Sequence, residues 1–255
     1  MRITWVQWLL FLTTVFTTTL AGGPQFSISI MAILLAHEFG HYFAARHHGV
    51  EATLPYFIPS PLFLGTMGAF IKMTSPTPNR KALFDIAVAG PIAGLCVALP
   101  ITVIGIARSH YTLVTKQVID IVQPPFFQWV ATLFHGPAPT NAILTLDPLA
   151  LAGWAGLFLT ALNMLPIGQL DGGHASYAFN HEFSLYLSIC MLLWLVFSTS
   201  YIMIAVLLLL MGIGHRPTED DTIELDGKRK WIGCLLWGFS LFCFVPNIIT
   251  VVKPM

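Results

Sequence analysis

Long intervals without a charged side chain are the feature that most constrains this chain. No Asp, Glu, Lys or Arg occurs between Arg2 and Glu38. Four further uncharged intervals follow, at residues 86–107, 148–170, 183–215 and 231–252. Charge is costly in hydrocarbon, and roughly 20 apolar residues suffice for a helix to cross a bilayer. The sequence therefore predicts an all-α polytopic membrane protein with about six transmembrane helices.

The composition agrees with a chain that has lipid as its main solvent. Hydrophobic residues make up 56% of the 255 positions and charged residues only 9%, whereas soluble domains carry roughly 25% charged residues. Twelve basic and twelve acidic side chains cancel, so no net field favours a nucleic-acid partner. The four cysteines lie in apolar stretches without a C-x-x-C spacing, and we expect them to be small buried side chains. They are Cys96, Cys190, Cys234 and Cys243.

Two of the uncharged intervals need separate interpretation. The break at residues 21–25 contains two glycines and Pro24 and divides the first interval into two helices. The interval at 183–215 is too short for two full crossings at about 1.5 Å per residue, which predicts one long tilted helix. A cleaved secretory signal after Arg2 is the alternative for the first helix, but a second apolar helix follows at once and favours a retained span.

Prolines exclude two further uncharged stretches as membrane-spanning helices. Residues 53–71 contain three prolines together with Gly65 and Gly68, which would break helical hydrogen bonding repeatedly. Such backbone persists at membrane depth only if it pairs internally or is buried in protein. This predicts a re-entrant loop or a short β-hairpin after the second helix, with residues 63–71 at its centre. Residues 121–146 combine four prolines with four aromatic residues, which indicates an interfacial aromatic segment.

Basic residues predict the orientation in the membrane. The segment after the second helix carries Arg46, Lys72, Arg80 and Lys81, and short loops rich in Lys and Arg stay on the cytoplasmic side. Counting spans alternately puts residues 216–230 on the opposite side, although that loop also holds four basic residues, so the two indications conflict. No Arg- and Ser-rich transit peptide precedes the first helix, so we expect either a prokaryotic chain or one that is already processed. Of these, a multi-pass protein of a prokaryotic cytoplasmic membrane is the favoured prediction.

A cluster of ionisable residues interrupts the second apolar helix. His37, Glu38 and His41 form the pattern His-Glu-x-x-His. Two histidines four residues apart project from one face of a helix and can bind one zinc ion, and Glu38 then lies where it can act on a water at the metal. Ionisable side chains inside a spanning helix are costly and by default functional. The sequence therefore predicts a zinc site within the membrane, with Glu38 as its general base.

A zinc ion with catalytic chemistry needs a third protein ligand. Asp171 is the first charged residue after the interval 148–170, so it lies near a helix end. Pro166 and Gly168 interrupt the helix just before it, which frees backbone groups to bind something else. A solvated helix end is the plain alternative for an acidic residue at such a boundary. Together with the two histidines, Asp171 becomes the candidate third ligand.

Other polar residues near these motifs have simpler readings. His47 and His48 follow the helix that carries the His-Glu-x-x-His motif, and we interpret them as polar residues at the membrane interface. His174 lies close enough to Asp171 in sequence to support the metal site indirectly. The glycines at 90 and 94 have the small-x-x-x-small spacing of close helix packing in lipid.

A zinc transporter is the competing function, because intramembrane histidines and aspartates also line metal pathways. It leaves Glu38 unexplained, as does a catalytically inactive scaffold.

The chain resembles the site-2 protease family of intramembrane zinc metalloproteases. Three motifs coincide in the expected order: His-Glu-x-x-His at 37–41, a Gly-x-x-Gly hairpin at 65–68, and Asn-x-x-Pro-x-x-x-Leu-Asp-Gly at 163–172. Residues 54–61 resemble the subgroup with chloroplast and cyanobacterial members. Many relatives carry a PDZ domain or a nucleotide-binding module, and we expect neither within this chain.

The resemblance implies roles for the residues that match these motifs. His37, His41 and Asp171 would bind one zinc ion, and Glu38 would be the base. The substrate-binding residues would be Asn163 and the hairpin glycines Gly65 and Gly68. The substrate would be the transmembrane segment of another membrane protein, cut in regulated intramembrane proteolysis with the active site towards the cytoplasm.

The resemblance also implies how the chain is organised. Residues 1–255 would form a single membrane-embedded protease domain with a catalytic core at about 26–180. Peripheral helices would lie at 1–22, 183–213 and 231–252. The oligomeric state is left open.

Overall fold

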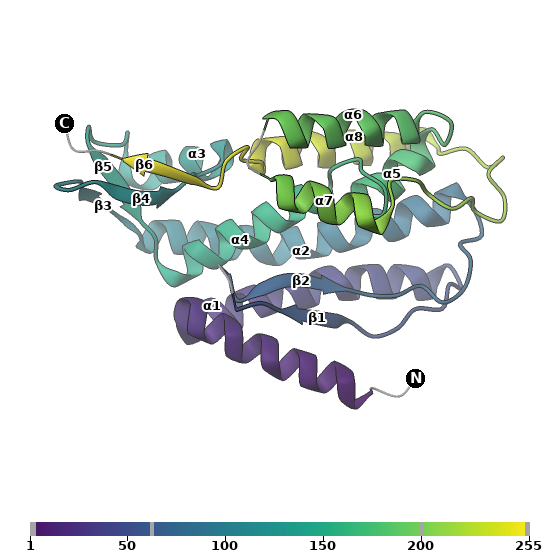
Figure 1. The fold of residues 1–255 in the computed structure, drawn as a ribbon, viewed down its shortest axis with the longest axis horizontal. Coiled ribbons are helices and arrows are strands. Elements are labelled where there is room, and N and C mark those ends of the chain that lie inside the picture. Colours follow the sequence, from purple (N-terminus) through teal and green to yellow (C-terminus); the bar gives the residue numbers. More distant parts are fainter. Residues whose placement is uncertain (1–3, 62–63, 199–200, 253–255) are drawn as a thin grey trace.

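Helices dominate the architecture of the chain in a computed structural model (Figure 1). Residues 4–61, 64–198 and 201–252 are described, so Arg2 and Phe63 of the sequence predictions lie outside them. The helices are α1 Trp5–His47, α2 Arg80–Arg108, α3 Pro125–His135, α4 Pro148–Asn163, α5 Asp171–Phe179, α6 Ser184–Ser198, α7 Ile202–Met211 and α8 Gly227–Cys243. The strands are β1 Tyr56–Pro59, β2 Thr66–Phe70, β3 His110–Leu113, β4 Val118–Ile121, β5 Ala142–Thr145 and β6 Ile249–Val252.

Helix α1 consists of two arms that fold back on each other. Gly23 has non-helical backbone angles (φ 83°, ψ 175°) and precedes Pro24. The hydroxyl oxygens of Thr18 and Ser27, one on each side of the bend, lie 2.7 Å apart. Figure 1 shows the two arms running in opposite directions. The predicted break at residues 21–25 is therefore confirmed.

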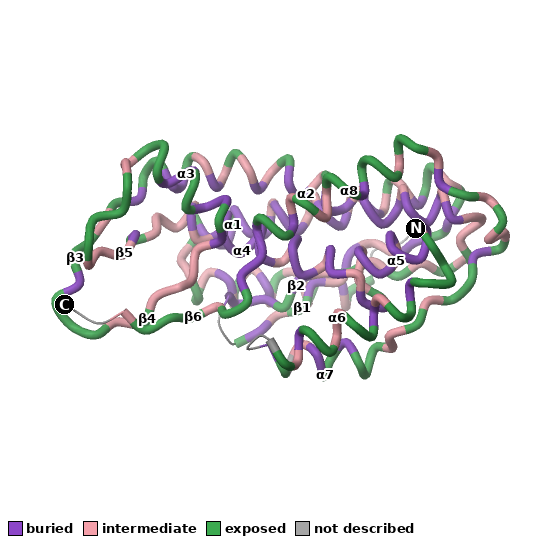
Figure 2. Tube along the Cα trace, turned by 90° about the horizontal axis from the view of Figure 1, so that it is seen from above, coloured by how far each residue is buried: buried purple, intermediate pink, exposed green. Residues whose placement is uncertain are grey.

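The second arm of α1 packs with α2 and α4 into the centre of the molecule. Figure 2 shows buried residues concentrated along these elements and α5. Phe26, Trp154 and Leu157 are fully buried there. Small residues let the backbones approach closely, because a Cβ at Gly40 would lie 2.4 Å from the Ala89 carbonyl oxygen. This close contact between α1 and α2 holds the helix that carries the candidate site.

The predicted β-hairpin is present as the antiparallel pair β1–β2. Tyr56 is opposite Phe70, and the register shifts at a bulge before Pro59. The hairpin is fastened to the first arm of α1, because Thr17 Oγ1 donates a 2.6 Å hydrogen bond to the Gly65 carbonyl. A paired hairpin satisfies part of its own backbone, as proline-rich backbone surrounded by apolar helices must.

The interval 183–215 contains two short helices, so the prediction of one long tilted helix is wrong. α6 has 15 residues and α7 has 10. At 1.5 Å per residue these helices are about 22 Å and 15 Å long, which is shorter than the roughly 30 Å hydrocarbon core. Buried Tyr201, directly before α7, donates its hydroxyl hydrogen to the Val245 carbonyl. That contact joins residues 44 positions apart, and local hydropathy does not predict it.

Six full-length spans are not confirmed. Two helices of the described chain, α1 and α2, are long and apolar enough to cross a bilayer, and α4 and most of α6 are shorter apolar helices. α4 ends at Asn163 because the passage with Pro166 and Gly168 follows it. The mostly helical character of the prediction is confirmed, while the number of crossings stays a prediction.

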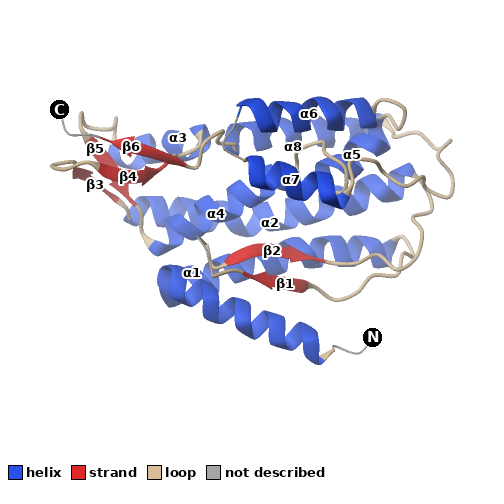
Figure 3. Cartoon of the chain, in the orientation of Figure 1, coloured by secondary structure: helices blue, strands red, loops and turns tan. Residues whose placement is uncertain are grey.

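The fold is not purely helical, which corrects the all-α prediction. β3 pairs with β5 and β4 pairs with β6, both antiparallel, at the end of the molecule near the C-terminus (Figure 3). Short strands of this kind were missed because one partner, β6, lies far away in sequence. The predicted aromatic segment contains α3, in which Phe127 is buried and Trp129 is exposed.

The loop before α8 lies on the same side of the molecule as the basic segment after α1. The Glu219 N–H donates to the Thr77 carbonyl, and the Asp220 N–H donates to the Pro78 carbonyl, both at 3.0 Å. The counting that placed residues 216–230 on the opposite side is therefore wrong. It failed because two short helices precede this loop where one span was expected. The basic residues of both segments therefore lie on the same side of the molecule, as expected for basic loops on one side of a membrane.

The cysteines differ from the expectation that all are buried. Cys243 is buried, whereas Cys96, Cys190 and Cys234 are exposed on the surface of the chain. All four are free thiols. The expectation failed because these three lie on helix faces that no other described element covers.

Candidate active site

The His-Glu-x-x-His motif lies on the second arm of α1. His37, Glu38 and His41 are buried, with relative exposures of 5%, 3% and 7%. The helical spacing of four residues brings the two imidazole rings to a centroid distance of 4.8 Å. The three side chains therefore form one compact polar cluster within apolar packing.

Asp171 completes a group of three ligand-type side chains. His37 Nε2 lies 3.1 Å from Asp171 Oδ2, His41 Nε2 lies 3.3 Å from Asp171 Oδ1, and the two Nε2 atoms are 3.1 Å apart. In a tetrahedral zinc site with bonds of about 2.0–2.1 Å, ligand atoms are about 3.3 Å apart. The spacing of these three side chains thus fits one zinc ion. The structure brings together all three predicted metal ligands.

Hydrogen bonding fixes the orientation of His41. Its Nδ1 lies 2.7 Å from the carbonyl oxygen of Ile86, which can only accept a hydrogen bond. Nδ1 therefore carries the hydrogen, and the lone pair of the neutral ring is on Nε2, which faces Asp171. Metal-binding histidines commonly have this arrangement, in which a carbonyl fixes the tautomer.

Two glycines of α2 make room for the histidines. A Cβ at Gly90 would lie 2.1 Å from His41 Nε2, and a Cβ at Gly94 would lie 3.2 Å from His37 Nδ1. The predicted role of these glycines in close helix packing is confirmed. Their packing partners are the side chains of the two histidines of the site.

The passage between α4 and α5 folds tightly to position Asp171 at the start of α5. A Cβ at Gly172 would lie 2.1 Å from the Met164 carbonyl oxygen, so the chain before and after the turn is in backbone contact. Trp237 of α8 donates from its indole nitrogen to the same carbonyl at 3.0 Å. The turn is thus held from both sides, which keeps Asp171 close to α1.

Glu38 lines a cavity of about 120 Å³ together with His41, Asp171 and His174. The backbone of Ile71, directly after β2, interacts with the Glu38 carboxylate by a hydrogen bond. Residues 70, 71 and 73 form another wall of this cavity. The end of the hairpin therefore lies beside the proposed base.

A second, smaller cavity of about 50 Å³ lies on the other side of His37. Asn163 and Gly68 line it together with His37 and Thr160. Two of the three residues expected to bind substrate thus meet beside the metal ligands. Gly65 is placed elsewhere, since a Cβ there would lie 2.5 Å from the Thr17 carbonyl oxygen in the first arm of α1.

The sequence missed His215 and understated His174. His174 Nδ1 lies 2.6 Å from His215 Nε2, although the two residues are 41 positions apart. No motif spacing links them, and the only signal for His215 is a histidine next to a long uncharged interval. His48, which the sequence placed at the interface, lies 3.0 Å from Asp85 in α2.

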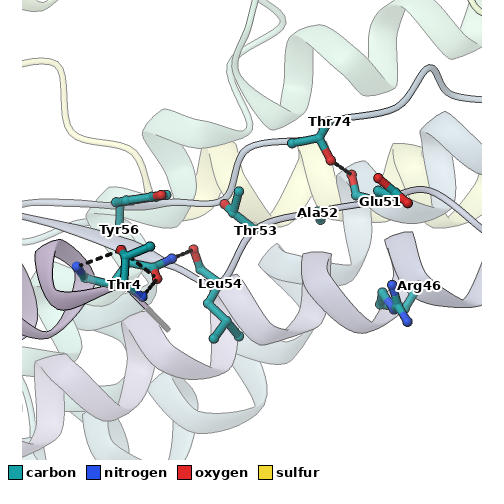
Figure 4. A pocket seen from close by; sticks show the side chains of 9 residues that line it. Thr4, Arg46, Glu51, Ala52, Thr53, Leu54, Tyr56 and Thr74 are labelled. Atoms are coloured by element: carbon teal, nitrogen blue, oxygen red, sulfur yellow. Dashed lines mark hydrogen bonds between the residues drawn. The ribbon is translucent and has the colours of Figure 1, made fainter. Parts of the chain in front are cut away.

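The larger cavity in Figure 4 lies away from this cluster. It measures about 350 Å³ and is bounded by the start of α1 and the chain leading into β1, where Gln7 donates to the Leu54 carbonyl at 2.8 Å. Its described lining includes Arg46 and Glu51 but neither histidine nor cysteine. We therefore assign the chemistry to the smaller cavity beside the metal ligands.

Two imidazoles and a carboxylate converge beside a buried glutamate inside apolar helices, and these are the residue types of a metallopeptidase centre. The chain belongs to Peptidase family M50, because the model of that family matches residues 25–185. The matched range contains His37, Glu38, His41, Asn163 and Asp171. The resemblance to the site-2 proteases is thereby confirmed.

Curated relatives are described as zinc metalloproteases of plants. The "Probable zinc metalloprotease EGY1, chloroplastic" of Arabidopsis thaliana is 37% identical over 155 residues, covering 57% of this chain and 28% of that protein. The "Probable zinc metalloprotease EGY2, chloroplastic" of Oryza sativa subsp. japonica is 32% identical over 167 residues, covering 62% and 30%. The corresponding EGY3 protein of Oryza sativa subsp. indica is 27% identical over 257 residues, covering 88% and 42%. The matched segments are thus less than half of these relatives, and the predicted prokaryotic location is not confirmed.

Proposed function

We propose that this protein is an intramembrane zinc metalloprotease, which hydrolyses a peptide bond in or near the transmembrane segment of a membrane-protein substrate. The observation that carries the proposal is the set of ligand distances of 3.1–3.3 Å among His37, His41 and Asp171, with Glu38 beside them. Membership of Peptidase family M50 and the names of the relatives support the same activity.

His37, His41 and Asp171 would hold the zinc ion. When bound, zinc would polarise the peptide carbonyl and lower the pKa of a water molecule towards about 7. Glu38 accepts the proton of the attacking water and later returns it to the leaving amine. Glu38 is buried and lines the same cavity as His41 and Asp171, so its carboxylate lies within reach of a water at the metal position.

The hairpin suggests how the substrate backbone is bound. β2 pairs with β1 on one edge only. Residues 67–69 line the small cavity beside His37, and residues 70, 71 and 73 line the cavity beside Glu38. An extended substrate added along the other edge of β2 would pass the metal ligands between the two cavities. Asn163 and Gly68 would contact it at the smaller one.

Strand addition requires the substrate helix to unwind first. Backbone groups exposed in hydrocarbon cost several kcal/mol each unless they find partners. Helix-breaking residues in the substrate, such as Gly, Asn or Pro, reduce that cost. We therefore expect substrates with such residues to be cut faster than those whose span is uniformly rich in Leu.

The zinc transporter considered from the sequence receives no support. Within the described ranges, the triad is the one group of at least three ligand-type side chains close enough together to hold a metal ion. A transport path needs a series of polar sites to hand the ion across the bilayer. The triad instead has a buried glutamate beside it, for which hydrolysis provides a role.

We further propose a single membrane-embedded domain whose catalytic core is residues 26–180. The first arm of α1, the α6–α7 pair and α8 would be peripheral. The side of the membrane that carries the basic residues near 72–81 and 216–230 would also carry the opening of the Glu38 cavity. The relatives are chloroplastic by name, so we leave the kind of membrane undefined.

Replacement of Glu38 by Gln tests the proposed function. The purified full chain should keep its zinc, measured by elemental analysis, but lose cleavage of a single-span substrate, because an amide cannot accept the proton. Glu182→Gln, at an exposed glutamate, is the matched control and should retain both properties. Normal cleavage by Glu38→Gln would rule out the proposed mechanism.

A further inference from the structure

A second pair of histidines lies beside the metal triad. His174 of α5 lines the cavity that contains Glu38, His41 and Asp171. His215 belongs to the segment between α7 and α8. The two rings are nearly perpendicular, at 88°, with centroids 4.7 Å apart. The sequence motifs give His215 no role, and the hydrolysis mechanism above does not use either ring.

The donor and the acceptor in the contact between His174 and His215 can be assigned from the neighbouring hydrogen bond. His215 Nδ1 is hydrogen-bonded to the carbonyl oxygen of Arg216, which can only accept, so this nitrogen carries the hydrogen. Burial lowers the pKa of His215, and the ring is therefore neutral at pH 7, with a lone pair on Nε2. His174 must then donate through Nδ1 across the 2.6 Å contact. The remaining nitrogen of His174, Nε2, is left as a hydrogen-bond acceptor.

The position of His215 is fixed by its neighbours. Its ring stacks on Tyr177, with centroids 4.3 Å apart and planes 27° apart. The Tyr177 hydroxyl donates to Asp221 at 2.6 Å, and Gln169 donates to the Gly214 carbonyl at 2.7 Å. The segment after α7 is thus anchored on both sides of His215, to the turn before α5 and to α5 itself. A ring held this firmly can impose one tautomer on its partner.

An uncharged acceptor in this cavity has a specific use. A substrate strand brings backbone N–H groups that have lost their helical partners, and each one needs an acceptor in an apolar setting. Asp171 and His41 Nε2 are directed at the metal position, and Glu38 is needed for proton transfer. Two lining side chains have an acceptor without charge, His174 and Gln169. Gln169 is exposed, and its amide nitrogen is bonded to the Gly214 carbonyl, so the half-buried His174 is the better placed of the two.

We propose that His215 is a positioning residue, which holds His174 as the Nδ1–H tautomer so that His174 Nε2 accepts a backbone N–H of the bound substrate. This inference rests on the proposed protease function. It assigns a substrate-binding role to a residue pair that lies outside the metal triad and the hairpin.

Amide substitutions separate the two nitrogens of His174. In His174→Asn the amide nitrogen can replace Nδ1 while nothing replaces Nε2, whereas in His174→Gln the amide oxygen can replace Nε2. The net loss of one hydrogen bond corresponds to about a fivefold change. We expect KM to rise about fivefold in His174→Asn, with kcat and zinc content little changed, and to be partly restored in His174→Gln.

His215→Phe keeps the stacking on Tyr177 but removes the hydrogen bond. It should raise KM as His174→Asn does. His181→Phe is the matched control, because the exposed His181 also contacts the Tyr177 ring, with ring centroids 6.0 Å apart. Loss of zinc in His215→Phe would overturn the proposal, since the pair would then support the metal and not the substrate.

Nitrogen-15 NMR of histidine-labelled, zinc-loaded full chain tests the tautomer independently of activity. His174 should carry its hydrogen on Nδ1 in the native protein, and His215→Phe should shift it towards Nε2. A native His174 protonated on Nε2 would overturn the inference. If the native chain cleaves no substrate while the tautomer is as expected, the protease function fails and the assigned hydrogen-bond direction stands.

Discussion

The metal end of the molecule and the β-strand end are built by different means. Around the metal ligands, glycines bring α2 within van der Waals contact of His37 and His41, and an added Cβ would collide with an imidazole. At the other end, β3 to β6 form two-stranded sheets whose residues Leu113 and Ile119 are 68% and 73% exposed. The helices around the metal ligands are therefore closely packed, whereas the strands at the other end leave large apolar side chains exposed.

The difference teaches where substitutions should matter. Close packing with few voids transmits even one added methyl group to the ligands. Exposed side chains on short strands have few partners to disturb. Effects on zinc binding and cleavage should therefore fall steeply from the metal end to the strand end, and the following changes are chosen to break or sharpen that contrast.

Asp171→Ala should have the largest effect. Two imidazoles alone make an incomplete zinc site, so zinc content of the purified chain, measured by elemental analysis, should fall to near zero, and cleavage with it. Asp120→Ala, in β4 at the strand end, is the control and should leave zinc content unchanged. Full zinc occupancy in Asp171→Ala would remove this residue from the ligand set.

Gly90→Ala should have the second-largest effect. The new Cβ would lie 2.1 Å from His41 Nε2, so the ring must move, and we expect a loss on the order of 10- to 100-fold in zinc affinity. Gly238→Ala is the matched control, because a Cβ at this position of α8 meets nothing within 4 Å. Competition with a zinc chelator measures both. Equal affinities would show that the α1–α2 contact is softer than its distances indicate.

Thr218→Val should have a smaller effect that depends on pH. Burial alone would raise the pKa of Asp221, but hydrogen bonds from Thr218 and Tyr177 outweigh it and hold the pKa below its usual value. Their contribution to stability is therefore present above the unfolded pKa of about 3.9 and is lost as pH falls through the folded value.

The measurement for Thr218→Val is the midpoint of thermal unfolding in detergent against pH. The variant should be less stable by about 1 kcal/mol near pH 7, and the difference from the native chain should shrink in acid. Thr222→Val removes the similar 2.6 Å bond from the exposed Thr222 to Asp220 and should change less. A pH-independent deficit would contradict the role given to Asp221.

Ile119→Thr should have the smallest effect. The side chain is exposed in β4, and threonine keeps the β-branched shape that suits strands. We expect a change within about 0.5 kcal/mol in stability and unaltered cleavage. A marked loss of cleavage would show that the strand end takes part in substrate binding, and the contrast between the two ends would have to be redrawn.

The sequence predicts the metal end far better than the strand end, because its signals there are local. A four-residue spacing places His37 and His41 on one helix face, and Pro24 marks the bend in α1. Asp171 was linked to them by chemistry, since zinc needs a third ligand. The β-hairpin followed from prolines that no helix accepts.

What the sequence did not predict depends on contacts between distant residues. The start of α7 is held by the hydrogen bond from Tyr201 to the Val245 carbonyl, and among the described strands β4 pairs with β6. The His174–His215 contact joins segments 41 residues apart. A hydropathy pattern predicts which residues are removed from water, but it does not predict which distant residues contact one another.

The carboxylate of Asp85 has a consequence for the direction from which a substrate approaches. It lies 3.0 Å from His48 at the end of α1 and 2.7 Å from Arg229 near the start of α8. One side chain of α2 thereby fastens the ends of three helices, and a peptide passing between them would have to break an ion pair. The free edge of β2 has no such fastening among the described residues. Under the proposed function, a substrate would therefore reach the metal ligands laterally, past the hairpin, and not along the axis of the helices.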